Sequence, residues 1–242
     1  MNDNLRDDEE RKFYALGNFG DGHKFGQIQA YEIFPDGSVV DKVDYEKFYD
    51  LESYLFTEVS TTFHRQGWVS TLYFFCIIIW KANRAKSKIA KRLKAQCDDD
   101  LDLAVYRLTS ELFEASTPER KLRVLMGEWG FLLPMASAIL TVFYPDDFTI
   151  YDTRVCDSLG DFHDLYNKTK LSRVWEGYER FVVAVKAASP QHLSLRDKDR
   201  YLWGKSFFSQ LKDDVYAGFP SRAETEMPEA SANIYLSKRA DI

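Results

Sequence analysis

Apolar positions recur at helical spacing over most of this chain. Between residues 101 and 113 they return every three or four positions, which places four of them on one helical face: Leu101, Val105, Leu108 and Leu112. The stretch 171–188 repeats the spacing with Leu171, Val174, Tyr178, Phe181 and Val185. Both stretches therefore predict amphipathic helices that pack one face against a core.

The longest apolar run, Thr71–Trp80, is shorter than the roughly 20 residues that cross a bilayer, so it predicts a buried helix. Residues 196–211 predict a last helix. One stretch departs from this pattern, because residues 26–40 are rich in β-forming residues around a Pro-Asp-Gly turn, which predicts a hairpin. The fold class that follows is mainly α, a helical bundle with a small N-terminal β hairpin.

Composition divides the chain into three parts. Residues 1–44 hold an acidic, polar start, which is unlike a signal peptide, followed by the predicted hairpin. Residues 45–216 carry the helical pattern and are expected to form one helical domain. Residues 217–242 are rich in Pro, Ser, Glu and Ala, which predicts a flexible C-terminal tail.

Charge and cysteine usage narrow the class of function. The net charge of −6 argues against indiscriminate binding of polyanions, but it leaves room for a local basic patch. Cys76, Cys97 and Cys156 show neither metal-ligand spacing nor a disulfide framework. We therefore expect no metal site, reduced thiols and a cytoplasmic location.

One segment has the opposite charge to the rest. Residues 81–94 hold seven basic side chains and no acidic one: Lys81, Arg84, Lys86, Lys88, Lys91, Arg92 and Lys94. The segment could be a solvated helix face that the acidic stretch DDDLD just after it, residues 98–102, balances. It could also be a surface that tracks phosphates, because Lys and Arg displace counterions from nucleic acid.

A further pattern lies between residues 116 and 155. The letters STPE fit a capping box, with Ser116 as N-cap and Glu119 at the third helical position. GEWGFLLP then interrupts the helix, and the small residues of ASAIL begin another one at Ala136. In YDTRV, Asp152 precedes a predicted helix at Thr153, where Asp is a favoured N-cap.

This arrangement resembles the helix-hairpin-helix (HhH-GPD) superfamily of DNA base-excision glycosylases, over about thirty residues. Gly130 matches the first hairpin glycine. Asp152 matches the family's aspartate, with Val155 three residues after it. Leu132 stands where a second hairpin glycine is expected, and Pro134 stands where bifunctional members carry a Schiff-base lysine.

The resemblance implies a two-lobed helical bundle of the HhH DNA glycosylase type. It implies monofunctional hydrolysis of the N-glycosidic bond of a damaged or modified base, flipped out of double-stranded DNA. Asp152 would stabilise the positive charge that develops at the sugar, and Pro134 implies no lyase step from that position. The implied protein is a monomer that lies in the cytoplasm, and at the nucleoid when bound to DNA. No cofactor is implied beyond a monovalent cation at the hairpin near Gly130.

The same resemblance places further residues. Side chains after the buried helix, in the hairpin and after the aspartate are candidates for DNA contacts: Lys81, Asn83, Arg84, Lys86, Lys88, Gly130 and Arg154. The side chain of Arg154 could equally pair with Asp152. Three aromatic residues are candidates to stack on the flipped base, although each could also belong to the core: Trp129, Tyr151 and Trp203.

Two other classes of function stay open. A protein could keep this scaffold and bind DNA without catalysis, which Leu132 and the acidic net charge would favour. The helices could instead form a protein-interaction domain. Base release separates the glycosylase from the first alternative, and salt-dependent DNA binding separates both from the second.

Overall fold

The computed structural model describes residues 32–33, 39–40 and 45–218. Contacts divide the chain into two units, Met1–Glu46 and Lys47–Ile242. The turn expected at residues 35–37 and the part of the tail from residue 219 onward lie outside the described residues.

The first unit contains two short strands, β1 (Glu32–Ile33) and β2 (Val39–Val40). They pair antiparallel, in the register Glu32–Val40 and Ile33–Val39. Antiparallel pairing is the arrangement that a hairpin needs, but the residues that would join the two strands are not among those described.

The rest of the described chain is helical. Its first part comprises η1 (Tyr45–Phe48), α2 (Leu51–Tyr54), η2 (Leu55–Val59), α3 (Ser60–Gln66), α4 (Thr71–Ala82), η3 (Asn83–Ala85), α5 (Lys86–Lys94) and α6 (Leu101–Glu114). Its second part comprises α7 (Pro118–Arg123), η4 (Val124–Glu128), α8 (Leu133–Phe143), α9 (Thr153–Leu159), η5 (His163–Asn167), α10 (Leu171–Ala187) and α11 (Leu195–Ala217). The prediction of a mainly α fold is confirmed.

The helices predicted from apolar spacing bury the expected faces. Helix α4 buries Tyr73, Phe74, Cys76, Ile77 and Ile78. Helix α6 buries Val105, Leu108 and Leu112, and α10 buries Val174, Tyr178, Phe181 and Val185. The first residue of each predicted face, Leu101 or Leu171, is only half-buried, because it lies in the first turn of its helix.

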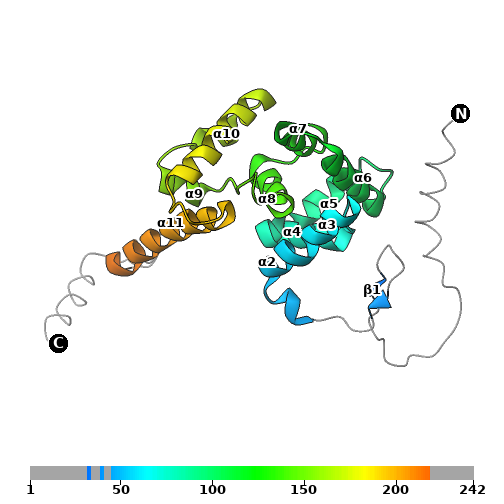
Figure 1. The fold of residues 1–242 in the computed structure, drawn as a ribbon, viewed down its shortest axis with the longest axis horizontal. Coiled ribbons are helices and arrows are strands. Elements are labelled where there is room, and N and C mark those ends of the chain that lie inside the picture. The colour runs from blue at the N-terminus through cyan, green and yellow to red at the C-terminus, as the bar shows by residue number, and fades with distance from the viewer. Residues whose placement is uncertain (1–31, 34–38, 41–44, 219–242) are drawn as a thin grey trace, which may run out of the picture. The chain divides into compact units, whose positions relative to one another are not determined.

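Helix α8 forms the centre of the second unit (Figure 1). Every residue from Met135 to Phe143 is buried, because α3, α4 and α7 pack against different sides of the helix. The small side chains of Ala136 and Ala138 are fully buried, and their size lets the neighbouring helices approach closely.

The start of α7 differs from the predicted capping box by one residue. Thr117, and not Ser116, is the N-cap, since its side chain accepts a hydrogen bond from the Arg120 N–H at 3.1 Å. Pro118 explains the shift, because proline suits the first helical position and makes the preceding residue the cap. Glu119 therefore lies one position too early to reach back to the cap.

The chain between α8 and α9 is held by three helices. Successive N–H groups of residues 149–151 donate to Tyr178 Oη on α10, Asp199 Oδ2 on α11 and Ser137 Oγ on α8, at 3.1, 3.4 and 2.9 Å. These bonds fix the backbone immediately before Asp152. The position of that side chain is therefore set by three elements that are far apart in sequence.

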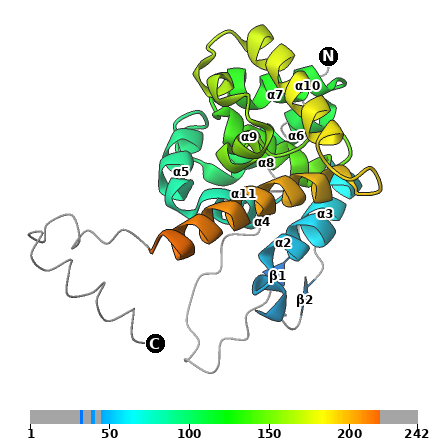
Figure 2. The same cartoon turned by 90° about the vertical axis from the view of Figure 1, so that its left-hand side faces the viewer.

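Helix α11 packs along α9, and both lie beside α10 (Figure 1). Figure 2 shows α11 along its length. Its first half buries Leu195, Lys198, Asp199 and Leu202, whereas most side chains of its second half are exposed. In the described ranges, no helix combines the length and the apolar character that crossing a membrane requires.

Candidate active site

The loop between η4 and α8, which the resemblance treats as the hairpin, contains one residue in the left-handed conformation. Gly130 has a φ of +66°, which glycine adopts without the steric cost of a Cβ atom. Leu132 has a φ of −79° and a ψ of 153°, which is ordinary extended backbone. Leu132 is therefore unstrained at the position where the resemblance expects a second glycine.

A guanidinium group lies against this hairpin. Arg92 Nη1 on α5 donates to the Gly130 carbonyl at 2.7 Å, and the guanidinium lies 4.6 Å from the centre of the Phe131 ring. A monovalent cation at the hairpin would need carbonyl oxygens of this kind as ligands. Because the Gly130 oxygen already faces a positive charge, the residues do not fit a cation at that oxygen. Nor do the described residues contain a cluster of His, Cys, Asp or Glu that could hold a metal ion.

Asp152 is both the N-cap of α9 and one half of an ion pair. Its Oδ1 accepts a hydrogen bond from the Arg154 N–H at 3.0 Å, as predicted for a capping aspartate. Its Oδ2 lies 2.5 Å from Lys81 Nζ, which the last turn of α4 presents. The side chains of Asp152 and Lys81 are 25% and 15% exposed, so the pair is partly shielded from water but still open to it.

This environment keeps the Asp152 carboxylate ionised. Burial alone raises the pKa of Asp152, but the charge and hydrogen bond of Lys81 and the Arg154 N–H outweigh burial and hold the pKa below its ordinary value. The group is therefore negative at neutral pH. A carboxylate in this state can stabilise a positive charge, but it cannot donate a proton unless it first receives one.

The ion pair faces a cavity of about 440 Å³. This volume lies within the range of roughly 300–1,000 Å³ that is usual for small-molecule sites. The lining side chains come from α2, α4, α11 and the segment before α9: Glu52, Trp80, Lys81, Ile150, Asp152, Arg196, Asp199, Arg200 and Trp203. A flat polar ring would find both aromatic surfaces and hydrogen-bonding groups there.

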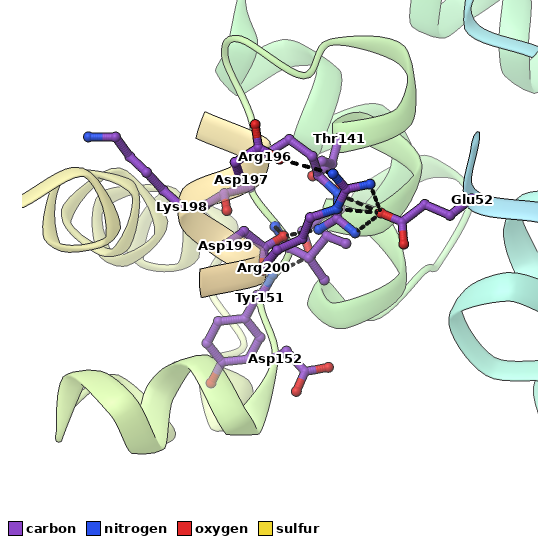
Figure 3. Close-up of polar contacts among 12 residues, drawn as sticks. Glu52, Thr141, Tyr151, Asp152, Arg196, Asp197, Lys198, Asp199 and Arg200 are labelled. Carbon is purple, nitrogen blue, oxygen red and sulfur yellow. Dashed lines mark hydrogen bonds and ion pairs between the residues drawn. The ribbon is translucent and has the colours of Figure 1, made fainter. Parts of the chain in front are cut away.

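Four of these side chains form a charged network, which we define as Glu52, Arg196, Asp199 and Arg200. Figure 3 shows the Glu52 carboxylate of α2 facing the two guanidinium groups of α11. Glu52 Oε1 accepts hydrogen bonds from Arg196 Nε at 3.1 Å, from Arg196 Nη2, and from Arg200 Nε at 3.0 Å. Arg196 Nη1 also donates to Asp199 Oδ2 at 2.5 Å. The network joins the start of the second unit to its last helix.

The side chain of Asp199 is more buried than that of Asp152. It is only 3% exposed. Burial raises its pKa to about 6, although Arg196 and the Ile150 N–H act in the opposite direction. Because Asp199 bonds to the Arg196 guanidinium and to the Ile150 N–H, it serves to hold Arg196 and the segment before Asp152 in place.

Guanidinium groups pack against aromatic rings at the cavity and beside it. The Arg196 guanidinium lies 5.3 Å from the centre of the Trp80 ring. The Arg154 guanidinium lies 5.3 Å from the ring of Trp203 and 5.4 Å from that of Phe207, and these two rings are stacked. The Arg154 side chain thus covers aromatic rings, and only its backbone N–H bonds to Asp152.

Two of the three aromatic candidates lie away from the cavity, which corrects their prediction as pocket residues. Trp129 is buried, and its Nε1 donates to Glu111 Oε2 at 2.7 Å. Tyr151 is buried as well; its hydroxyl donates to the Phe162 carbonyl at 2.8 Å, and its ring points away from the charged network in Figure 3. Both are core residues with satisfied polar atoms. Trp203, which is 41% exposed, does line the cavity.

The candidates for DNA contact at the end of α4 and after it fall into two groups. Asn83, Arg84, Lys86 and Lys88 are exposed on η3 and the first turn of α5, where Lys86 Nζ donates to Asn83 Oδ1 at 2.8 Å. Lys81 instead faces the cavity and pairs with Asp152. The four exposed residues can contact a partner at the protein surface, whereas Lys81 can contact only a molecule that enters the cavity.

The apolar pattern does not predict that α11 and α2 contribute to the cavity. Arg196, Asp199, Arg200 and Trp203 are spaced i, i+3, i+4 and i+7, which is one face of a helix. This face is the signal in the sequence that could have identified them. Glu52 offers no such signal, because its partners lie 144 and 148 residues further along the chain.

Comparison of the chain with protein-family models, with curated proteins and with solved structures finds no match. The assignment of a function therefore rests on the cavity, the Lys81–Asp152 pair and the hairpin.

Proposed function

We propose that this protein is a DNA base-excision glycosylase that hydrolyses the N-glycosidic bond of a damaged or modified base. One observation carries the proposal: an ionised carboxylate, Asp152, faces a cavity of ligand-binding size that two tryptophans help to line. The cavity would receive the base after it has been flipped out of double-stranded DNA, because an enzyme cannot reach the glycosidic bond of a stacked base. Asp152 would then face the sugar.

The chemistry of base release suits a fixed carboxylate. As the bond between the base and C1′ breaks, positive charge develops on the sugar ring, and a nearby anion lowers the energy of that state. The same oxygen atoms can orient a water molecule for attack on C1′. Pro134 has no amine, so the start of α8 supplies no nucleophile, and the proposed base-release step is hydrolytic.

Other features support binding of a duplex. Gly130 and its hairpin lie at the N-terminus of α8, the position from which such a hairpin approaches a phosphate. The exposed side chains of Arg84, Lys86 and Lys88 could contact further phosphates. Trp203 at the cavity could stack on the flipped base.

The test uses a panel of duplexes that carry damaged or naturally modified bases, with wild type and Asp152→Asn compared. Asparagine caps a helix about as well as aspartate, so α9 keeps its start while the negative charge is lost. We expect base release to fall by at least about 10²–10³-fold, the usual effect of removing one stabilising group. DNA affinity should stay the same or rise, because a negative charge is removed near the DNA.

The remaining outcomes separate the alternatives. Equal base release by wild type and Asp152→Asn would remove Asp152 from its proposed role. Salt-dependent binding of duplex DNA without release of any base in the panel would favour a non-catalytic DNA-binding protein. Absence of salt-dependent binding would favour a protein-interaction domain.

A further inference from the structure

The Lys81 amine points to a second reaction at the same cavity. We propose that Lys81 is the nucleophile of an abasic-site lyase, which cleaves the DNA strand at the deoxyribose that base release leaves behind. This inference rests on the proposed function and extends it by one step. Pro134 excludes a Schiff-base lysine at the start of α8, but it does not exclude an amine that α4 brings to Asp152 from 71 residues away.

Geometry makes Lys81 the amine that can reach the sugar. Its Nζ lies 2.5 Å from Asp152 Oδ2, and both side chains line the same cavity. A deoxyribose that meets the Asp152 carboxylate therefore also meets Nζ. Lys81 is the only lysine among the described residues that line this cavity, whereas Lys86 and Lys88 are exposed on the surface.

The surrounding side chains also hold Lys81 in place. Lys81 is 15% exposed, so its long side chain has lost most of the freedom that a surface lysine keeps. A protonated amine cannot attack a carbonyl carbon, and Asp152 is the acceptor that can take its proton. Buried lysines are a recurrent source of Schiff-base nucleophiles.

The first half of the reaction forms an iminium ion. The protonated Lys81 transfers a proton to Asp152, and the neutral amine adds to the C1′ aldehyde of the ring-opened abasic sugar to give a carbinolamine. Asp152 returns its proton to the carbinolamine hydroxyl, which leaves as water. The products are the positively charged iminium between Nζ and C1′, one water molecule and the Asp152 carboxylate.

The second half breaks the strand. Asp152 removes a proton from C2′, the electron pair of that C–H bond forms a double bond between C2′ and C3′, and the C3′–O bond breaks. The downstream strand leaves with its phosphate as a monoester. Asp152 passes the C2′ proton to the departing phosphate and becomes a carboxylate again. Water then hydrolyses the iminium, which releases the unsaturated aldehyde and regenerates protonated Lys81. The sequence of steps needs no oxidant, reductant or cofactor.

The experiment starts from a preformed abasic site, so that the identity of the excised base does not matter. A duplex with one abasic site is mixed with the full-length protein and sodium borohydride, which reduces an iminium to a stable amine. We expect a covalent protein–DNA adduct, and peptide mass mapping of wild type should locate it on Lys81. Without borohydride, the same duplex should be cleaved on the 3′ side of the abasic site.

Two variants separate chemistry from structure. Lys81→Arg keeps a positive charge beside Asp152 but has no nucleophilic amine, and Lys81→Met removes both. Adduct formation and strand cleavage by either variant should fall to the level of the reaction without protein. Lys186→Met, which changes an exposed lysine on α10, is the matched control and should form the adduct as wild type does.

Each outcome bears on one proposal. Absence of an adduct with wild type, or its location on an amine other than Lys81, would overturn the lyase inference even if a variant failed to fold. If wild type releases a base from the lesion panel but forms no adduct, the glycosylase proposal stands and the enzyme is monofunctional. If the adduct forms on Lys81 but no base is released from any duplex, the lyase stands and the glycosylase proposal fails.

Discussion

Asp152 and Asp199 line the same cavity, but their surroundings give them opposite properties. Asp152 lies at the N-terminus of α9, is 25% exposed and has a pKa below its ordinary value. Asp199 lies in the first half of α11, is 3% exposed and has a pKa raised to about 6. Both face one basic partner at 2.5 Å, so the presence of an ion pair alone does not explain the difference.

The depth of burial explains why the pKa values of the two aspartates shift in opposite directions. At Asp152, the loss of water is partial, and Lys81 and the Arg154 N–H compensate for it. At Asp199, the loss of water is nearly complete and outweighs Arg196. The cavity therefore holds one carboxylate that is poised for charge stabilisation and a second that holds the scaffold together, although the two are the same residue type.

The largest effect is expected on stability, from Asp199→Ala. The variant leaves the Ile150 N–H unpaired and removes one of the two carboxylates that face Arg196. We expect the free energy of unfolding to fall by about 3 kcal/mol, the low end of the range for breaking a buried pair, because Glu52 still faces Arg196. Urea unfolding measures this loss.

The matched control is Asp197→Ala, two residues earlier on the same helix. Its ion pair with Arg200 is about half exposed, so the cost should stay below about 1 kcal/mol. Equal losses from the two variants would contradict the structural role of Asp199.

The pH dependence of stability gives a second measure of Asp199. The folded protein binds this proton more tightly than the unfolded chain does, because burial raises the pKa from 3.8 to about 6. The contribution of this group to stability is present below pH 3.8 and is lost as the pH rises through about 6. Wild type should show this loss in urea titrations across that window, and Asp199→Ala should lack it.

A smaller effect is expected from Trp203→Ala, on binding rather than stability. If Trp203 stacks on the flipped base, its loss should weaken affinity for a substrate duplex by about 1–3 kcal/mol. Trp129→Phe is the control, because Trp129 lies in the core and donates to Glu111. Trp129→Phe should lower the stability of the protein and leave the DNA affinity of the folded protein unchanged. If it instead weakened DNA affinity without lowering stability, Trp129 would be a pocket residue.

Lys81→Met should change the pH dependence of base release. Without Lys81, burial raises the pKa of Asp152 with less opposition, so Asp152 is protonated at a higher pH. The acid limb of the single-turnover rate should move to higher pH than in wild type, while it stays in place in Lys186→Met. If the acid limb of Lys81→Met stayed at the wild-type pH, the rate of base release would not depend on the ionisation of Asp152.

The smallest effect is expected from the exposed basic residues. Replacing Lys86 and Lys88 with Ala should weaken binding to all duplex sequences alike, and it should lower the salt slope by about 0.9 for each lost phosphate contact. The control replaces Lys186 and Lys212 with Ala, which changes the net charge equally at exposed positions on α10 and α11. If both double variants changed the salt slope of DNA binding by the same amount, the basic segment would be only a solvated surface.

Local sequence patterns predicted much of the fold. The apolar spacing located α4, α6 and α10 and most of their buried faces, because a helix that buries one side needs apolar residues every three or four positions. The N-cap role of Asp152 was predictable for a similar reason, since a cap bonds to an N–H two residues away. The error at Ser116 was also local, because two adjacent residues could both cap and Pro118 decided between them.

Tertiary structure alone decided the composition of the cavity. Trp129, Tyr151 and Trp203 are similar as aromatic residues in a sequence, but packing buries the first two and leaves the third at the cavity. Lys81 was expected to contact DNA as part of a basic segment, yet the end of α4 lies beside the start of α9 and turns it toward Asp152.

The sequence by itself therefore determined that the chain is mainly helical, where α4, α6 and α10 lie and which faces they mostly bury, and the cap that presents Asp152. Each of these depends on residues a few positions apart. Only the tertiary structure decided which groups meet that carboxylate. The partners of Glu52 lie more than 140 residues away and that of Asp152 lies 71 residues away. The exposure of each acid, and hence the direction of its pKa shift, depends on how completely α2, α4 and α11 exclude water from it.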